Sequence, residues 1–366
     1  MKTRAAVVRE PSTPFAIEEL DMDALQDDEL LVKVAGVGVC HTDLICRAQV
    51  YPVPMPSVFG HEGSGIVQAV GAKVTEFCKG DAVVMSYRSC GACVNCQVGE
   101  PSHCLEIFPR NFSCARDDGS TTLSKEGIPV HGMFFGQSSF ADYAIAKASS
   151  AVKVPENTTV PLEHLGPLGC GIQTGAGAVM NTLQPAAGSS LAVFGCGSVG
   201  ISAILAAKIS GCGTIIAVDP LAGRRELAEE MGATHSIDPT EEDPVARCHE
   251  ITKYGADYSL ECTAIPAVLR QSVDALIVNG TCGLIGASPL GTEVTLDMNS
   301  IMFGRTVKGI VEGDSIPREF IPKLIALYQG GQFPLDRLIT TYALDEIETA
   351  VRDMESGKAL KPVLIP

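Results

Sequence analysis

The chain has 366 residues, of which 46% are hydrophobic and 19% charged, and 43 acidic against 27 basic residues give a formal net charge of -16. One hydrophobic core rarely serves a chain of this length, so we expect two domains, and the composition excludes a disordered or fibrous protein. The negative charge repels phosphate backbones and anionic membrane surfaces, which argues against a nucleic-acid or membrane partner.

The N-terminal residues 1–11 include basic side chains but no apolar core of the kind that marks a secretory signal, and we interpret them as a first strand. No uninterrupted apolar run of about 18 residues predicts a membrane span. The 14 cysteines of a chain without a secretory signal favour reduced thiols over disulfides. We therefore expect a cytoplasmic protein whose cysteine spacing reports thiolate chemistry.

The first 150 residues or so are expected to be mostly β. Short valine-rich runs broken by glycine and proline occur at residues 30–34, 65–70 and 82–85.

Three separated residues of this region could together hold a metal ion. Cys40, His61 and Cys170 supply two thiolates and an imidazole, which would leave a fourth position of a zinc ion open for water or substrate. Each of these residues alone is weak evidence for a metal site, because a single buried cysteine is more often a small core side chain than a ligand. Glu62 would fill the open position in a resting state, or would simply cap or pair at the surface.

Two neighbours of Cys40 suit catalytic chemistry at such a site. Asp43 is placed to orient the imidazole of His61, and the hydroxyl of Thr42 is placed to take the proton of a bound alcohol. Two thiolates would neutralise a zinc ion that still polarises an alcohol oxygen.

A second cysteine group follows the valine-rich runs. Its members are closely spaced: Cys90, Cys93, Cys96 and Cys104. Four thiolates can surround one zinc ion with no open position, which predicts a structural site. An iron–sulfur cluster and four unrelated thiols are the alternatives. Residues 105–136 then form a long polar stretch, which we interpret as a loop that is either functional or a plain surface connection.

From about Thr174 the pattern changes to short apolar runs that alternate with helix-like segments. The predicted strands are residues 191–194, 214–218, 258–261 and 281–285, and the predicted helices begin near Gly197, Arg224 and Pro266. This alternation predicts a parallel sheet covered by helices.

A glycine-rich motif joins the first of these strands to a helix over residues 198–209. The motif comprises Gly195, Cys196, Gly197, Ser198, Val199 and Gly200. Its glycines allow a tight turn and a close approach of a pyrophosphate to the helix N-terminus. Asp219 follows about 20 residues later, where a carboxylate binds the ribose hydroxyls and repels a 2'-phosphate, so NAD is favoured over NADP. Arg224 is a second candidate for ribose contact or a solvated helix start.

After about Ile310 the chain returns to mixed elements, with a helix over residues 344–354 and a last strand over 363–365. We expect this tail to rejoin the first domain. The predicted domains are residues 1–172 with 311–366, and residues 173–310.

The order of these motifs resembles the zinc-dependent alcohol dehydrogenases of the medium-chain dehydrogenase family. The resemblance runs nearly from end to end, and Gly169-Cys170-Gly171-Ile172-Gln173-Thr174-Gly175-Ala176-Gly177 is similar to the aryl-alcohol (benzyl alcohol) dehydrogenase branch, close to enzymes of allylic terpene alcohols.

The resemblance implies an α/β protein with a GroES-like, mostly-β catalytic domain and a Rossmann domain with a doubly wound parallel sheet. It implies one catalytic and one structural zinc ion per subunit, NAD, a small alcohol or aldehyde as substrate, and a homodimer or homotetramer paired through the Rossmann domains. Cys40, His61 and Cys170 match the catalytic zinc ligands, and Thr42 and Asp43 match the proton-relay hydroxyl and the carboxylate behind the histidine. The positions that match cofactor contacts are His41, Thr174 and Lys361.

One position departs from the family pattern. Many relatives pass the alcohol proton through the nicotinamide ribose to a histidine where this chain has Ile45. The hypothesis here is that the proton leaves through the ribose to water or to His41.

The resemblance also places Phe134 and Phe135 along the alcohol pocket, with Tyr87 close to the cysteine group. An aromatic, apolar pocket favours benzylic or allylic primary alcohols, whereas core packing is the other interpretation of these side chains.

Other functions stay open at this point. The alternatives are an aliphatic or sugar-alcohol dehydrogenase, an enzyme of the formaldehyde–glutathione adduct, a zinc- and NAD-binding relative without catalysis, and a zinc-free quinone reductase. A glutathione adduct would need positive charge near the pocket, for which Arg88, Arg110 and Arg116 are the candidates.

Overall fold

The computed structural model describes all 366 residues, and the chain divides into two compact units. The first unit consists of Met1–Gly171 and Ile316–Pro366, and the second is Ile172–Ser315.

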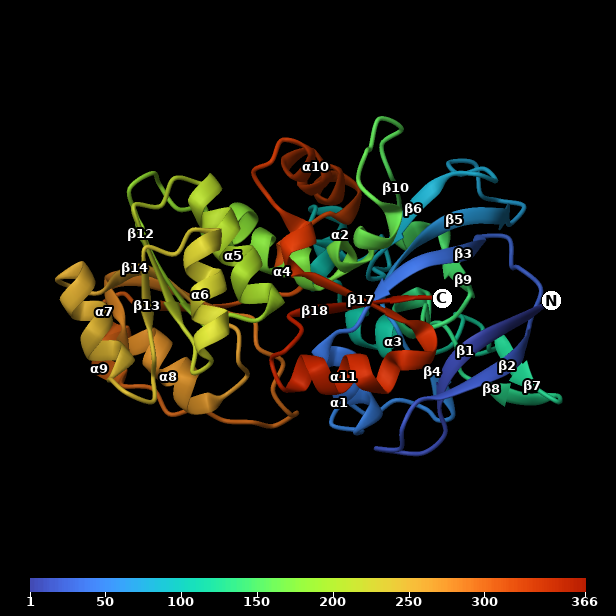
Figure 1. Cartoon of the computed structure of the whole chain (residues 1–366), viewed down its shortest axis with the longest axis horizontal. Helices are drawn as coiled ribbons and strands as arrows, with labels where there is room; N and C mark the ends of the chain where they lie inside the picture. The colour runs from blue at the N-terminus through green and yellow to red at the C-terminus, as the bar shows by residue number, and fades with distance from the viewer. The chain divides into compact units, whose positions relative to one another are not determined.

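Two sheets form most of the first unit (Figure 1). The five-stranded sheet has the order β4 (Ser57–Val58), β1 (Lys2–Val8), β2 (Ala16–Met22), β7 (Leu123–Lys125) and β8 (Ile128–Val130). The seven-stranded sheet has the order β10 (Ala151–Lys153), β6 (Ala82–Met85), β5 (Glu62–Val70), β3 (Glu29–Gly38), β18 (Lys361–Ile365) and β17 (Ile339–Ala343), with β9 (Tyr143–Lys147) paired to β3. The expectation of a mostly-β first part is confirmed.

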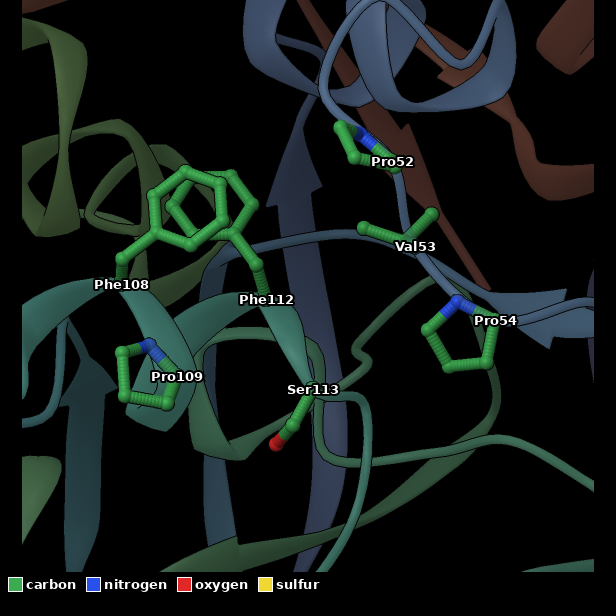
Figure 2. Close-up of a pocket in the computed structure, with 7 residues that line it drawn as sticks. All are labelled: Pro52, Val53, Pro54, Phe108, Pro109, Phe112 and Ser113. Carbon is green, nitrogen blue, oxygen red and sulfur yellow. The ribbon is translucent and has the colours of Figure 1, made fainter.

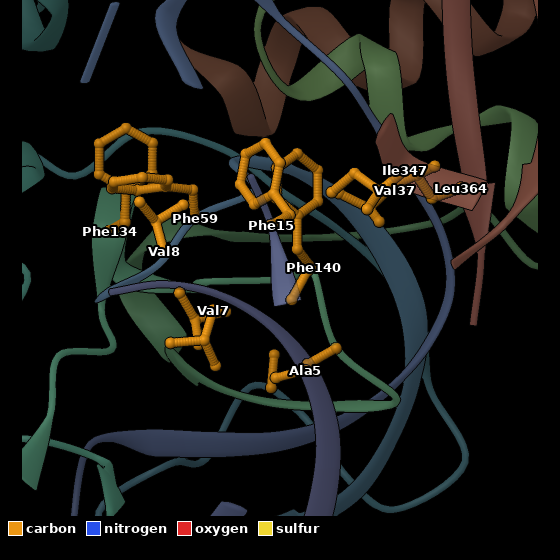
Figure 3. Close-up of a cluster of buried hydrophobic side chains, with 14 of the residues drawn as sticks. Ala5, Val7, Val8, Phe15, Val37, Phe59, Phe134, Phe140, Ile347 and Leu364 are labelled. Atoms are coloured by element: carbon orange, nitrogen blue, oxygen red, sulfur yellow. The ribbon is translucent and has the colours of Figure 1, made fainter. Parts of the chain in front are cut away.

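The core of this unit lies where the two sheets and the C-terminal segment meet. Val7 and Val8 of β1, Val37 of β3 and Leu364 of β18 are fully buried, and Figure 3 shows them beside a group of phenylalanine rings. The last strand pairs antiparallel with β3 through Val363 and Leu364. The C-terminal tail therefore packs on the strand that leads into Cys40.

Short helices connect these strands. Those of the first unit are α1 (His41–Arg47), α2 (Val94–Gln97), α3 (Ile107–Phe112), α10 (Pro317–Gln329) and α11 (Ile347–Glu355). The predicted helix over 344–354 is α11 preceded by a 3-10 turn, Leu344–Glu346. The stretch 105–136 is less irregular than its sequence suggests, because it contains α3 and the paired strands β7 and β8.

The second unit is a six-stranded sheet in which every neighbouring pair of strands is parallel. Its order is β13 (His235–Ile237), β12 (Thr214–Val218), β11 (Ser190–Phe194), β14 (Ala256–Glu261), β15 (Leu276–Leu284) and β16 (Thr306–Gly309). Its helices are α4 (Gly171–Gly177), α5 (Ser198–Ile209), α6 (Ala222–Met231), α7 (Pro244–Thr252), α8 (Pro266–Asp274) and α9 (Met298–Met302). Figure 1 shows α5 and α6 on one side of the sheet and α7 and α8 on the other, which is the doubly wound arrangement expected.

The predicted strands and helices of this unit are found, but one strand begins earlier than predicted and several short elements were not predicted. β15 begins at Leu276, before the predicted residue 281; the polar Asn279 and the following Gly280 interrupt the apolar run of the sequence, and Asn279 adopts a left-handed conformation (φ 69°) within the strand. The short strand β13 and the helix α7 were not predicted, since neither carries a strong periodic pattern.

Candidate functional site

The first unit brings Cys40, His61, Glu62 and Cys170 together. One ligand atom from each lies within 4.8 Å of all the others. Cys40 ends the loop after β3 and precedes α1, His61 and Glu62 stand at the start of β5, and Cys170 follows a 3-10 turn. His61 and Glu62 are completely buried.

The imidazole of His61 is held in the tautomer that can bind a metal ion through Nε2. Its Nδ1 lies 2.9 Å from Oδ1 of Asp43, which can only accept a hydrogen from it. The Asp43 carboxylate is itself fixed by the backbone N–H groups of Cys40 and Gly60, at 3.0 Å each. This tautomer leaves a lone pair on Nε2, and Nε2 is buried without a hydrogen-bond partner. A buried polar atom left unpaired costs about 1–3 kcal/mol, so the site fits a metal that accepts this lone pair.

The surroundings of Cys40 also favour metal binding, because they favour its thiolate form. A hydrogen bond with Cys170 holds the pKa of Cys40 well below its ordinary value, in spite of burial, with help from the positive charge of Lys361. A thiolate is the form that binds zinc. The donor set of two thiols, one imidazole and one carboxylate therefore suits Zn²⁺.

Glu62 has a partner that sequence reasoning missed. The ammonium of Lys361 lies 2.9 Å from both Glu62 oxygens and donates to the carbonyl of Val39 at 3.2 Å. Burial alone would lower the pKa of Lys361, but the Glu62 carboxylate raises it, so the lysine stays charged. Lys361 and Glu62 are separated by 299 positions, and no local pattern reveals the pair. The predicted contact of Lys361 with a cofactor stays a prediction.

The residues of α1 next to Cys40 differ in exposure. The hydroxyl of Thr42 lies 3.9 Å from the sulfur of Cys40, and His41 is exposed at the first position of the helix. Ile45 is 7% exposed and offers no titratable group.

An aromatic wall, defined as Phe112, Phe134 and Phe135, lies against His61. The Phe135 ring is 4.5 Å from the imidazole, centroid to centroid, and the Phe134 ring is 5.5 Å away. Phe112 of α3 contacts both rings, at 5.9 Å and 5.2 Å. Tyr87 is buried in the same core cluster. Phe112 was not predicted, because it lies in the stretch interpreted as a loop.

An open groove of about 400 Å³ continues from this wall. Figure 2 shows Phe108 and Phe112 stacked, with centroids 4.5 Å apart, facing the Pro52–Val53–Pro54 segment. Its remaining lining residues are Pro109 and Ser113. The groove is thus mostly apolar and shares Phe112 with the aromatic wall.

The four-cysteine group also converges. The ligand atoms of Cys90, Cys93, Cys96 and Cys104 lie within 4.8 Å of one another. Backbone N–H groups point at their sulfurs, for example those of Cys93 toward Cys90 at 3.2 Å and of Leu105 toward Cys93 at 3.5 Å. Hydrogen bonds from the backbone of Cys96 and Leu105 lower the pKa of Cys93 to about 6. Such N–H donors stabilise thiolates around a metal, and the arrangement fits a structural zinc ion.

The glycine-rich motif in the second unit has the predicted strand–turn–helix geometry. Gly195 adopts φ 94°, and a Cβ at Gly200 would overlap the carbonyl of Gly195. Gly197 faces open space, and α5 starts at Ser198, so the free N–H groups of Ser198 and Val199 are available to a phosphate.

Asp219 ends β12 beside this turn. Its carboxylate accepts from the backbone N–H groups of Cys196 and Leu221, at 2.8 and 2.9 Å. Arg224 lies 3.8 Å from it, whereas Arg225 donates to its backbone carbonyl. Thr174 of α4 is 7% exposed, and the neighbouring Gly175 packs against the carbonyl of Val199.

Two family models match the chain. Residues 26–156 match the alcohol dehydrogenase GroES-like domain, and residues 198–329 match zinc-binding dehydrogenase. Geraniol dehydrogenase of Castellaniella defragrans is 46% identical over 100% of this chain and 98% of its own length. S-(hydroxymethyl)glutathione dehydrogenase of Escherichia coli is 34% identical, with both chains covered completely.

A solved structure is similar over the same length. The crystal structure of benzyl alcohol dehydrogenase from Acinetobacter calcoaceticus has a TM-score of 0.96 and 48% identity, and covers 100% of this chain and 99% of that one. These matches confirm the predicted combination of a GroES-like domain with a Rossmann domain. No helix in the structure has the length and apolar character that crossing a membrane requires.

Proposed function

The chain belongs to the zinc-dependent medium-chain alcohol dehydrogenase family, and on that premise we propose that it uses zinc and NAD to oxidise primary aryl or allylic alcohols to aldehydes. The reaction is reversible and transfers a hydride to NAD. The observation that carries this proposal is the aromatic wall of Phe112, Phe134 and Phe135 against the imidazole of His61.

Flat, delocalised substrates suit such a wall. Rings and alkenes pack against aromatic faces and edges with energies of about 0.5–1.5 kcal/mol per contact beyond simple burial. The adjoining groove of about 400 Å³ would accommodate the apolar tail of a longer allylic alcohol. Two relatives are named geraniol dehydrogenase and benzyl alcohol dehydrogenase, and these alcohols suit the aromatic wall and the apolar groove.

In the proposed mechanism, Cys40, His61 and Cys170 would hold the catalytic zinc ion, with Glu62 as an alternative ligand. When bound, the metal would polarise the alcohol oxygen and NAD would accept the hydride. Thr42 accepts the hydroxyl proton of the substrate, and Asp43 keeps His61 in the tautomer that presents Nε2. The aromatic wall excludes water and orients the substrate. Cys90, Cys93, Cys96 and Cys104 would hold the structural zinc ion.

NAD would bind through the glycine-rich motif and Asp219. The two backbone hydrogen bonds to Asp219 fix a carboxylate where the ribose hydroxyls of NAD would donate. His41, Thr174 and Arg224 are the further proposed cofactor contacts. Lys361 is proposed as one only on the family resemblance, because its ammonium is buried and paired with Glu62. With Ile45 apolar, we propose that the proton leaves through the ribose to water or to His41.

The glutathione-adduct alternative lacks a free cation near the aromatic wall. Arg88 is bonded to Asp117 at 2.7 Å, and Arg110 to Glu106. Arg116 makes two 2.9 Å hydrogen bonds to Glu29. An arginine already neutralised by a carboxylate binds the carboxylates of glutathione weakly, so this alternative is less well supported than an apolar alcohol.

We further propose a cytoplasmic homodimer or homotetramer. All 14 cysteines are free thiols, as expected in a reducing compartment. At the edge strand β16 and helix α9, exposed apolar side chains include Met298, Met302 and Phe303, at 85%, 70% and 61% exposure. Such a surface favours pairing with a second copy. Sedimentation analysis should give a dimer or tetramer, and a monomer at micromolar concentration would contradict the assignment.

Phe135→Ala is expected to raise the Michaelis constant for benzyl alcohol by about tenfold while that for ethanol changes less than about twofold. The reason is that only the larger substrate reaches the removed ring. Steady-state kinetics with the two alcohols test this, and Phe77→Ala, in a separate core cluster, controls for the loss of a buried ring. Equal effects on both alcohols would rule out Phe135 as a pocket residue.

A further inference from the structure

Arg88 stands between Tyr87 and the four-cysteine group, and its role is not explained by the proposed chemistry. Its side chain is only 3% exposed. The guanidinium donates to Asp117 at 2.7 Å and to the backbone carbonyl of Arg110 at 3.3 Å. A charge this buried and already paired is not available to a ligand, so its function must lie in what it holds in place.

The head of Arg88 holds the end of α3. Arg110 lies in the last turn of this helix, where carbonyls lack helical partners and a cation is favourable. Asn111 adds two bonds to the Arg88 backbone, accepting from its N–H at 2.8 Å and donating to its carbonyl at 2.9 Å. The helix has six residues and is too short to be stable alone. Its last residue, Phe112, which follows Asn111, is thereby fixed.

The stem of Arg88 packs against Gly136, the residue that follows the other half of the aromatic wall. Gly136 follows Phe135 and adopts φ 68°, and a Cβ at Gly136 would overlap the Cδ and Cγ atoms of Arg88. Phe135 itself has φ 50°, in the left-handed region that non-glycine residues seldom occupy. The surroundings must maintain this conformation, and the Arg88 stem is part of them.

We infer that Arg88 is a positioning residue that sets the spacing between the two halves of the aromatic wall. One half is Phe112, held through α3, and the other is Phe134 with Phe135, held through Gly136. The spacing determines how well a flat substrate is contacted on both sides, so Arg88 determines selectivity for aryl and allylic alcohols. This inference depends on the proposed function only in assigning the wall to the alcohol pocket.

The test compares Arg88→Ala and Arg88→Lys with the matched control Arg110→Ala, whose side chain lies on α3 and pairs with Glu106 and Asp117. We expect Arg88→Ala to raise the Michaelis constant for benzyl alcohol about tenfold, with that for ethanol within about twofold and kcat within about threefold. Arg88→Lys keeps the charge but cannot reach both acceptors, so an intermediate increase is expected. The control should retain wild-type selectivity.

A second readout does not use catalysis. The chain has no tryptophan, 12 phenylalanines and 7 tyrosines, so phenylalanine bands in the near-UV circular dichroism spectrum report packing of the wall. Arg88→Ala should weaken these bands with the far-UV spectrum and zinc content unchanged, and Arg88→Lys covers the case in which the alanine variant does not fold. If the wild type does not oxidise aryl and allylic alcohols, the proposed function is contradicted. The circular dichroism spectra would still test whether Arg88 positions the wall. Unchanged bands, or equal changes in the constants for both alcohols, would overturn the inference.

Discussion

Replacing Cys170 with serine is expected to lower kcat for alcohol oxidation by at least about a thousandfold, because a Lewis acid contributes several kcal/mol and each 1.4 kcal/mol is a factor of ten. Cys170 is one of the thiols whose sulfur lies within 4.8 Å of the other candidate ligand atoms. It also shares a hydrogen bond that lowers the pKa of Cys40, so its loss disturbs a second ligand.

Elemental analysis separates this effect from unfolding. The zinc content should fall from two ions per chain, one in each ligand group, to one ion per chain, which is bound by the four-cysteine group. Cys248→Ser is the control, since it removes another buried thiol, which lies in a core cluster of the second unit and belongs to neither ligand group. Retention of full zinc content and turnover by Cys170→Ser would exclude this residue as a ligand.

Thr42→Val is expected to reduce kcat by about a hundredfold to a thousandfold, the usual contribution of a positioned proton acceptor. Valine keeps the shape of threonine but has no hydroxyl. Ile45 supplies no titratable group, and the Asp43 carboxylate on the same helix is already bonded to His61 and to two backbone N–H groups, so the exposed His41 is the alternative acceptor that we consider. Zinc content should be unchanged, because Thr42 is not among the candidate ligands.

The variant Thr42→Ser tests whether the loss of the hydroxyl group explains the effect of Thr42→Val. Thr42→Ser restores a hydroxyl at nearly the same place and should recover activity to within about tenfold of the wild type. A valine variant that turns over within about threefold of the wild type would show that the proton leaves by another route.

Much of the fold followed from local patterns. The apolar strand before Gly195 and the helix after it are determined by neighbouring residues, and the second unit has this arrangement. The convergence of Cys40, His61 and Cys170 was expected from their chemistry taken together, although no single one of them is informative. Short strands such as β7 and β8 escaped prediction because three residues carry too little periodicity.

The features of the site that were not predicted depend on contacts between residues far apart in the sequence. The pairing of Glu62 with Lys361 depends on β18 lying beside β3, which brings distant parts of the chain together. Phe112 lies in the aromatic wall as part of α3, a short helix inside a polar stretch that is bonded to Arg88, a residue more than 20 positions earlier. Neither arrangement has a signal in a window of neighbouring residues.

The most direct test of the central claim is the initial rate of NAD reduction with benzyl alcohol, geraniol, ethanol and S-(hydroxymethyl)glutathione, measured on the same zinc-loaded preparation. The proposed function predicts that kcat/KM for benzyl alcohol or geraniol exceeds that for ethanol by at least about a hundredfold. It also predicts little turnover of the glutathione adduct, since the nearby arginines are already paired. Preference for ethanol or for the glutathione adduct would contradict an aryl or allylic alcohol dehydrogenase.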